Sequence, residues 1–289
     1  MWYWWALVFL AVFLIGVTKS GFGSGMGLMV VPLTAIALGH LPRGSEAALG
    51  LLLPLLILGD FLAIYQYRHL FAAPQAHTQI AGASGGGEQV AVAIRSSSSL
   101  LSIVGRMLPG TMAGVVVGGG LLWWFHQQPP TLLVALIWIE IGFESILLVG
   151  IHWWRQVRGE QSHLVPEPWR SHLTGSFAGA SSTLAHAAGP IVSMYLLPLR
   201  LDRQMFVGVS AFYFFILNTA KLPAYFVAGQ FARAELSFTL RFSPLVLAGA
   251  LFGFWVNRRM GDRLFMKIVY MLTFAIGWYM LIGGLVKLR

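Results

Sequence analysis

Two lysines lie inside or beside apolar stretches of this chain, where an ammonium group is costly unless it faces protein, water or a counter-charge. Lys221 stands in the run FFILNTAKLPAYF, about fifteen residues into an apolar segment, so its side chain is too short to reach the end of that segment. Asn218 lies about one helical turn before it, and Pro223 removes a backbone hydrogen bond from the same helix. This spacing predicts that Lys221 is the counter-charge for a bound anion, with Asn218 as a hydrogen-bond donor.

Lys19 precedes a run of alternating glycines, GFGSGMG, at the end of another apolar stretch. Glycines expose backbone N–H groups, Ser20 and Ser24 add hydroxyl donors, and the helix that follows begins with a partial positive charge. We interpret this segment, including Gly25, as a cradle for a small anion with Lys19 as a second attracting charge. The alternative is a lysine at a helix end that extends to the membrane surface, beside glycines that allow close helix packing.

A second break, GASSTLAHAAGP, offers side chains rather than bare backbone. Ser181, Ser182 and Thr183 are hydroxyl donors, His186 is titratable, and Gly189 ends the break just before a proline. We predict that these residues bind the anion and that His186 is also a candidate for proton coupling. A single histidine is equally compatible with a structural hydrogen bond.

Three carboxylates lie in apolar segments: Asp60 in LLILGDFLAIY, and Glu140 and Glu144 in ALIWIEIGFESILLV. The two glutamates share a helix face at a spacing of four residues, so they would repel each other if both were ionised. A buried carboxylate that takes up and releases a proton can couple proton movement to that of another solute, so all three are candidates for this role. The open alternative is a structural ion pair between a carboxylate and a lysine, namely Asp60 or Glu140 with Lys19 or Lys221.

The two breaks belong to stretches that look like copies of one another, Lys19 to Tyr67 and Gly175 to Tyr225. Each copy has a broken apolar segment followed by a long apolar helix. If Gly50 is matched to Gly208, Asp60 falls on Asn218 and Tyr67 falls on Tyr225. Paired interruptions at corresponding positions of two halves mark the binding site in many carriers. The sequence therefore predicts a site between the breaks, near the middle of the membrane.

The composition requires a membrane. Of 289 residues, 57% are hydrophobic and only 10% are charged, and the mean hydropathy is +0.74. Soluble domains have about 25% charged residues, so we expect a multi-pass protein of the cytoplasmic (inner) membrane that contacts membrane lipids. The net charge of +9 is spread over many loops, which suits lipid headgroups better than nucleic acid. The chain has no cysteine.

Apolar segments of about 20 residues are long enough to cross a bilayer as helices. They predict an all-α polytopic transmembrane protein with about eight to ten membrane elements in two related halves with broken helices. We expect a first half at 1–150 with a flexible Gly/Ser loop at about 69–104, a polar linker at 151–171 and a second half at 172–289. The expected segments are 48–66, 107–125, 131–150, 206–228, 236–257 and 264–286, with broken regions at 2–39 and 172–198.

Lysines and arginines near the segment ends indicate an orientation. With 2–39 counted as a hairpin and 172–198 as one crossing, nine fall on one side and six on the other. The side with nine includes the linker and the C-terminus and is expected in the cytoplasm. The nine are Arg68, Arg95, Arg106, Arg155, Arg158, Arg170, Arg233, Lys287 and Arg289, and the six are Arg43, Arg200, Arg203, Arg258, Arg259 and Arg263.

These motifs resemble the sulfite exporter family (TauE/SafE-type membrane proteins). The resemblance rests on the glycine-rich break with Pro32, the helix that begins near Gly50, the stretch GPIVSMYLLPL…VGVSAFYFFILNTAKLPAYF, and the C-terminal stretch that begins SPLVLAGALFGFWVNRRMGDRLF. It implies a polytopic carrier with an internal repeat that moves sulfur-containing anions such as sulfite or organosulfonates, often with the proton gradient. The partner would be a small inorganic or organic anion.

We therefore expect a secondary anion transporter, with no cofactor, no metal and no nucleic-acid partner, and a homo-oligomer stays open. Enzyme motifs such as HExxH, a P-loop or a Ser-His-Asp pattern are absent from the sequence, so we do not expect an enzyme. Three alternatives remain. One is a cation or amine carrier in which Asp60 and Glu140 bind the substrate, and another is a non-transporting component of a membrane assembly or sensor. The third is a membrane-embedded enzyme, which should show turnover in detergent without a gradient.

Overall fold

The computed structural model describes residues 2–23, 44–72, 97–125, 168–196, 203–229 and 236–288, with scattered positions elsewhere, mainly within 132–154. Every element in these ranges is a helix and none is a strand, which confirms the all-α class. The elements are α1 (Trp2–Val17), the π-helical turn η1 (Thr18–Phe22), α3 (Gly44–Gln66), α4 (His69–Ala72), α5 (Ser97–Phe125), α7 (Pro168–Ala185), α8 (Gly189–Leu196), α9 (Arg203–Ala220), α10 (Leu222–Val227), α11 (Leu236–Arg259) and α12 (Asp262–Lys287).

At least five of these helical stretches are long and apolar enough to cross a membrane, which confirms a polytopic membrane protein. They are Trp4–Phe22, Leu49–Gln66, Leu101–Trp124, Arg203–Val227 and Phe238–Arg259. The predicted loop at 69–104 is too long, because α4 and α5 occupy both of its ends, and only 73–96 lies outside the described residues. Likewise α7 begins inside the predicted linker at Pro168, a residue that suits the first turn of a helix. The boundaries between the halves stay a prediction.

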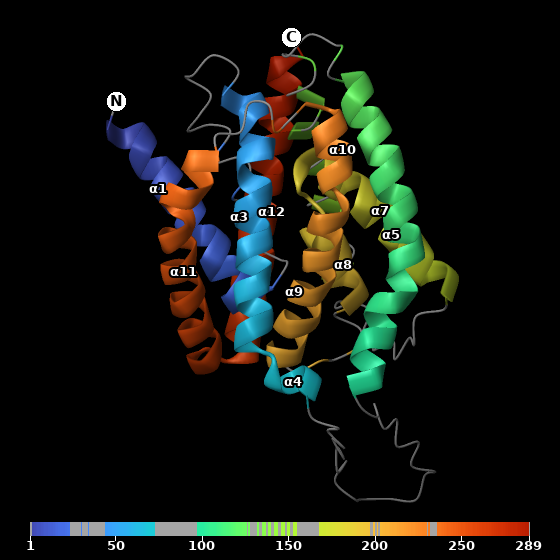
Figure 1. The fold of residues 1–289 in the computed structure, drawn as a ribbon, viewed down its shortest axis with the longest axis vertical. Helices are drawn as coiled ribbons and strands as arrows, with labels where there is room; N and C mark the ends of the chain where they lie inside the picture. The colour runs from blue at the N-terminus through green and yellow to red at the C-terminus, as the bar shows by residue number, and fades with distance from the viewer. Residues whose placement is uncertain are drawn as a thin grey trace, which may run out of the picture.

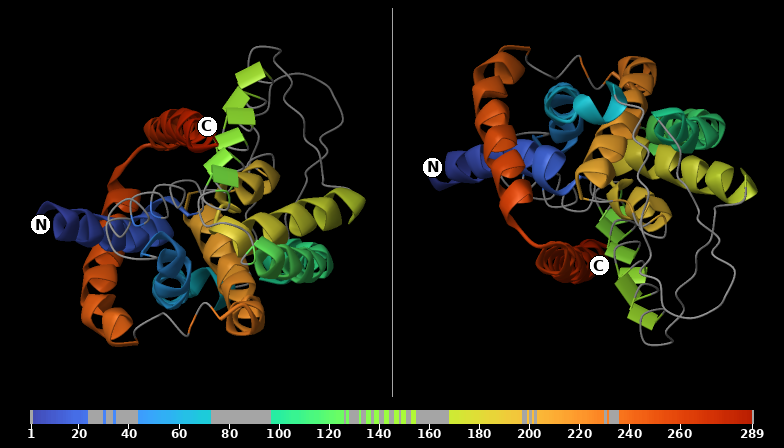
Figure 2. Two further views of the ribbon diagram at one scale, coloured as in Figure 1. Left: turned by 90° about the horizontal axis from the view of Figure 1, so that it is seen from above. Right: turned by 90° about the horizontal axis from the view of Figure 1, so that it is seen from below.

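Two close helix pairs each join the first helix of one half to the third long helix of the other. In Figures 1 and 2, α1 lies beside α11, and α5 lies beside α7. A side chain at Gly249 of α11 would collide with the Phe13 carbonyl of α1, and one at Gly114 of α5 would collide with the Ser176 carbonyl of α7. Close contact between small residues is a common means of holding helices together in a membrane. The two halves are therefore interlocked rather than side by side.

The two halves run in opposite directions. Tyr67, just after α3, packs against Gly208 near the start of α9, whereas Asp60 in the middle of α3 meets Asn218 near the end of α9. The equivalent helices α3 and α9 are therefore antiparallel, as Figure 1 also shows. An inverted repeat places the interrupted helices of both halves at the same depth.

The helix breaks are built alike in the two halves. Gly23 (φ 67°) ends η1, and His186 (φ 54°) ends α7, so both breaks turn through the left-handed region. In the first half the Tyr67 hydroxyl donates to the carbonyl of Ser20, three residues before Gly23, at 2.8 Å. In the second half the Tyr225 hydroxyl donates to the carbonyl of Thr183, three residues before His186, at 2.9 Å. The two halves therefore share the same tyrosine-to-carbonyl hydrogen bond at their breaks.

The basic residues gather at one end of the bundle, which corrects the expected orientation. Arg68 follows α3 and Arg203 begins α9, so these antiparallel helices bring both to the same end. Lys287 ends α12 next to the C-terminus, which lies at the other end of the bundle from α4, the helix that follows Arg68 (Figure 1). The segment count had placed Lys287 and Arg68 on the same side. Among the lysines and arginines whose side chains the structure describes, the central Lys19 and Lys221 apart, seven lie toward the first end and two toward the other. The seven are Arg68, Arg106, Arg170, Arg203, Arg258, Arg259 and Lys267, and the two are Arg241 and Lys287. By the positive-inside rule, we propose that the end with seven faces the cytoplasm.

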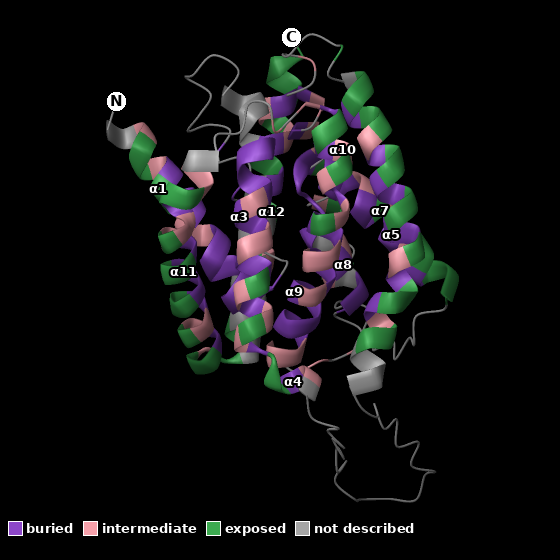
Figure 3. Cartoon of the chain, viewed as in Figure 1, coloured by how far each residue is buried: buried purple, intermediate pink, exposed green. Residues whose placement is uncertain are grey.

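Many residues on the outside of α5 and α11 are exposed (Figure 3), and the exposed residues of both helices include large apolar ones. Val116 of α5 and Phe226 of α10 are 73% and 76% exposed, which suits contact with lipid chains. The buried side chains include many polar ones, among them Lys19, Asp60, Asn218 and Lys221. Because burying such groups is costly, their position inside the bundle indicates a functional centre.

Candidate functional site

An ion pair and a hydrogen bond join the two halves at the centre of the bundle. The Lys19 Nζ atom lies 2.7 Å from Asp60 Oδ1, and Asn218 Nδ2 donates to Asp60 Oδ2 at 2.6 Å. The Lys19 ammonium also sits 4.3 Å from the centre of the Phe214 ring, a favourable cation–π distance. Lys19 therefore has a carboxylate partner, the structural alternative named above. Asn218, predicted to donate to the anion, uses one of its two Nδ2 hydrogens for Asp60, and its contact with an anion stays a prediction.

Lys221 lies in the turn between α9 and α10 and is fully buried. Its Nζ donates to the carbonyl and the hydroxyl of Ser182, both at 3.0 Å, and contacts His186 Nδ1 at 2.8 Å. An ammonium group has three N–H donors, so these three contacts use all of them. Lys221, Ser182 and His186 thus form a cluster at the second break, as the sequence predicts.

The neighbours of His186 assign its two ring nitrogens. Nδ1 faces the Lys221 ammonium and must accept, while Nε2 lies 3.1 Å from the carbonyl oxygen of Leu49 and must donate. The ring is therefore neutral, with its proton on Nε2. Its Nε2 also lies 3.4 Å from the Tyr225 hydroxyl. The contact with Leu49 ties the second break to α3 of the first half.

The charges of the two clusters do not balance. Lys19 and Asp60 cancel, and the described residues place no carboxylate within 4.0 Å of Lys221. The described partners of Lys221 are all neutral, so the described part of the buried centre carries one positive charge in excess when the lysine is protonated. A buried charge without a partner is expensive, and an anion would supply what is missing.

The predicted hydroxyl donors differ in the hydrogen bonds that their hydroxyl groups already make. Thr183 donates to the carbonyl of Gly179 at 2.8 Å, so its proton is used within α7. Ser182 accepts from Lys221, and Ser181 is buried beside it. Ser20 is fully buried, and its hydroxyl has no hydrogen-bond partner among the described residues. Gly189 is buried at the first position of α8. Four predicted site residues lie outside the described residues: Ser24, Gly25, Glu140 and Glu144.

Residue types alone missed several members of the site. Tyr67 and Tyr225, which hold the carbonyls of the two breaks, were matched by the repeat but not assigned a role. Their equal spacing from the matched glycines was the available signal. The Leu49 carbonyl and the Phe214 ring had no signal, because any residue supplies a carbonyl and apolar rings are common in this chain.

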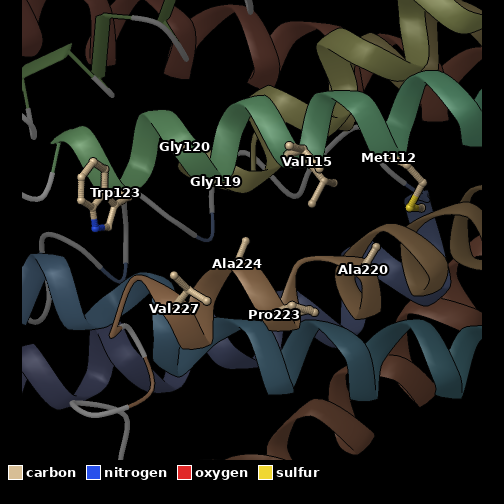
Figure 4. A pocket seen from close by; sticks show the side chains of 10 residues that line it. Met112, Val115, Gly119, Gly120, Trp123, Ala220, Pro223, Ala224 and Val227 are labelled. Carbon is tan, nitrogen blue, oxygen red and sulfur yellow. The ribbon is translucent and has the colours of Figure 1, made fainter.

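A surface cavity of about 560 Å³ lies away from these polar groups, between α5 and the α9–α10 turn (Figure 4). It is lined by apolar residues, namely Met112, Val115, Val116, Gly119, Gly120, Trp123, Ala220, Pro223, Ala224 and Val227. Val116 and Val227 are 73% and 75% exposed, which places the cavity on the lipid-facing surface. Among its lining residues it offers an anion no charged group, and the indole N–H of Trp123 is the one polar side-chain group. Nor do three His, Asp or Glu side chains come together as a metal site within the described ranges.

Broken helices of an inverted repeat, with ionisable side chains between them, define the architecture of a secondary membrane transporter. The chain belongs to the sulfite exporter TauE/SafE family, whose model matches residues 72–280, more than two thirds of its length. The match includes His186, Asn218 and Lys221 but begins after Lys19 and Asp60. The family implies a membrane transporter of sulfite or related anions, which agrees with the expectation that the protein is not an enzyme. Comparison with curated proteins and with solved structures gave no match.

Proposed function

We propose that this protein is a secondary carrier of a small sulfur-containing anion, such as sulfite or an organosulfonate, across the cytoplasmic membrane. The observation that carries the proposal is Lys221, a fully buried lysine whose contacts are all neutral. An anion bound beside it would balance the excess charge of the centre. Family membership supports the same substrate class.

The contact between Lys221 and His186 suggests how a proton moves with the anion. All three N–H groups of Lys221 are occupied, so an anion must replace one of its acceptors. A proton taken up by His186 on Nδ1 removes that acceptor, frees one N–H of Lys221 and adds a second positive charge. Anion binding and proton uptake therefore favour each other, which is the condition for coupled transport. The net direction then follows the combined gradients of anion and proton.

The cation or amine alternative needs a free carboxylate. Asp60 is held at one oxygen by Lys19 and at the other by Asn218, so neither oxygen is open to a cationic substrate. Glu140 lies outside the described residues. The arrangement around Asp60 therefore favours the anion carrier.

The test is uptake of labelled sulfite and of an organosulfonate into liposomes that contain the purified protein. Lys221→Met removes the charge but keeps the approximate length of the side chain, and we expect transport to be abolished without loss of folded protein, because Lys221 has no carboxylate partner among the described residues that would be left unpaired. Lys221→Ala should behave in the same way. Lys267→Met, at an exposed lysine of α12, is the matched control and should transport normally. Wild-type rates in Lys221→Met would refute the proposal.

Proton coupling is tested separately with a pH-sensitive dye inside the liposomes. His186→Asn suits this test, because asparagine tolerates the left-handed backbone of this residue and its side-chain oxygen can accept from Lys221 in place of Nδ1. We expect sulfite still to bind but to move without the matching proton signal. A proton-to-sulfite ratio equal to that of the wild type would remove His186 from the coupling mechanism.

A further inference from the structure

Several buried side-chain atoms around the end of η1 have no hydrogen-bond partner in the part of the chain that the structure describes. They are Ser20 Oγ on η1, Ser210 Oγ on α9 and Asn257 Oδ1 on α11, and these three residues are 0%, 0% and 1% exposed. Each is tied to the segment Ser20–Gly23: a side chain at Gly23 would lie 3.3 Å from Ser210 Oγ, and Asn257 Nδ2 donates to the Gly21 carbonyl. Buried polar groups without partners are rare, so three at one place indicate a missing ligand.

The carbonyl groups of this segment show which charge the ligand carries. The end of a helix normally offers free carbonyl oxygens, which would bind a cation. Here the Ser20 carbonyl accepts from Tyr67 at 2.8 Å, and the Gly21 carbonyl accepts from Asn257 at 2.7 Å. The groups left open include two hydroxyls that can donate to an anion. The remaining acceptor, Asn257 Oδ1, can take a hydrogen from water or from a singly protonated oxyanion.

The position of Ser210 connects this cluster to the rest of the site. Arg203, Ser210, Phe214, Asn218 and Lys221 follow one another at spacings of seven, four, four and three residues, so they share one face of α9 and its C-terminal turn. With a rise of 1.5 Å per residue, Ser210 lies about 10 Å from Arg203 and about 16 Å from Lys221 along this helix. Lys19, next to Ser20, covers Phe214 between them. A cation would meet positive charges on both sides of Ser210, whereas an anion would be attracted.

We propose that the Ser20 and Ser210 hydroxyls form a second subsite for the transported oxyanion, between the basic end of the bundle and Lys221. This inference rests on the proposed function, because it assumes that Lys221 binds the same anion. The anion would leave water near Arg203, pass the capped carbonyls and be held by the two hydroxyls. It would then pass Phe214 and the Lys19–Asp60 pair to reach Lys221. Because Gly23 has no side chain, this residue does not block the Ser210 hydroxyl on this route.

The test is the half-saturating sulfite concentration (KM) and the maximal rate of single serine variants, measured from each side of oriented vesicles. A hydrogen bond to a charged group is worth about 1.5–3 kcal/mol, so Ser20→Ala or Ser210→Ala should raise KM by about tenfold or more when sulfite is added at the basic end. The maximal rate, and KM from the other side, should change by less than about twofold. Ser243→Ala is the matched control, because that hydroxyl donates to the Leu240 carbonyl within α11.

The possible results separate the two proposals. If Ser20→Ala and Ser210→Ala keep the wild-type KM from both sides while Lys221→Met abolishes transport, the subsite is wrong and the carrier mechanism stands. An equal loss of maximal rate in both serine variants, with KM unchanged, would show a packing role and would also overturn the subsite. If the wild type moves neither sulfite nor an organosulfonate, both proposals fail.

Discussion

The ion pair between Lys19 and Asp60 allows a direct measurement of what holds the two halves together. Its atoms are 2.7 Å apart, Asp60 is fully buried, and Lys19 is 6% exposed. Removing one partner of such a pair leaves an unpaired buried charge and costs about 3–5 kcal/mol. Lys19→Met and Asp60→Asn should therefore each destabilise the protein by that amount. At roughly 2 °C per kcal/mol for a chain of this size, each variant should lose about 6–10 °C in Tm.

The double variant distinguishes a structural pair from two independent roles. Lys19→Met together with Asp60→Asn removes both charges, and the amide oxygen introduced at position 60 could still accept the hydrogen bond from Asn218. We expect its stability to return to within about 1 kcal/mol of the wild type, because replacing a buried ion pair by neutral groups is often neutral. The coupling energy of the cycle should then be at least about 5 kcal/mol, because the two single losses add to at least about 6 kcal/mol and the double variant loses at most about 1 kcal/mol. Heating in detergent, followed by size-exclusion chromatography of the folded fraction, measures all four proteins.

Two results would refute this reasoning. If the double variant is as unstable as the sum of the single variants, the two side chains do not interact and the pair is not what holds Lys19. If either single variant is within about 1 kcal/mol of the wild type, the remaining charge is not buried. The same proteins decide the role of Asp60 in coupling: a stable double variant that still moves protons with sulfite excludes Asp60 as the coupling carboxylate.

Other expected outcomes follow from single contacts. Tyr225→Phe and Tyr67→Phe should each lower the free energy of unfolding by about 0.5–1.5 kcal/mol, because each loses one buried hydrogen bond. Only Tyr225 also contacts His186, so Tyr225→Phe should raise KM more than Tyr67→Phe does. Thermal unfolding and uptake assays measure the two effects. Gly114→Leu should destabilise by the upper end of the roughly 1–3 kcal/mol range for overpacking, seen as loss of folded protein in detergent, and normal yield would contradict the α5–α7 contact. Because the chain has no native cysteine, His69→Cys and Lys287→Cys report sidedness, and an impermeant thiol reagent on whole cells should label only the second.

Sequence reasoning found the broken segments because glycine, serine and proline inside an apolar run are visible without a structure. It also matched Asp60 to Asn218 but left open whether the repeats were parallel or inverted. In an inverted repeat, equivalent residues close to the symmetry axis face each other, and Asn218 donates to Asp60 at 2.6 Å for this reason. Had the inversion been known, the pairing of these two residues would have followed from their equivalence.

The assignment of basic residues to the two sides failed for a related reason. It required counting crossings through 2–39 and 172–198, and each helix break changes that count. The antiparallel contact of α3 with α9 fixes Arg68 and Arg203 at one end without any count. The partners of Lys221 could not be predicted from the sequence either. The left-handed backbone of His186 places Nδ1 against the ammonium, and no residue pattern predicts that backbone conformation at a histidine.

The two halves share the hydrogen bonds at their helix breaks but differ in the charged side chains between them. In both halves a tyrosine hydroxyl donates to the carbonyl three residues before the break, so these hydrogen bonds are symmetric. The lysines are not equivalent: the position that matches Asp60 is Asn218, and Lys221 stands one turn further along α9. In the first half the lysine is therefore neutralised by a carboxylate, and in the second half the lysine meets neutral groups and a histidine. A symmetric pair of lysine–carboxylate contacts would leave no excess charge for a substrate, so the amide in place of a second carboxylate is what would suit this centre to the proposed anion.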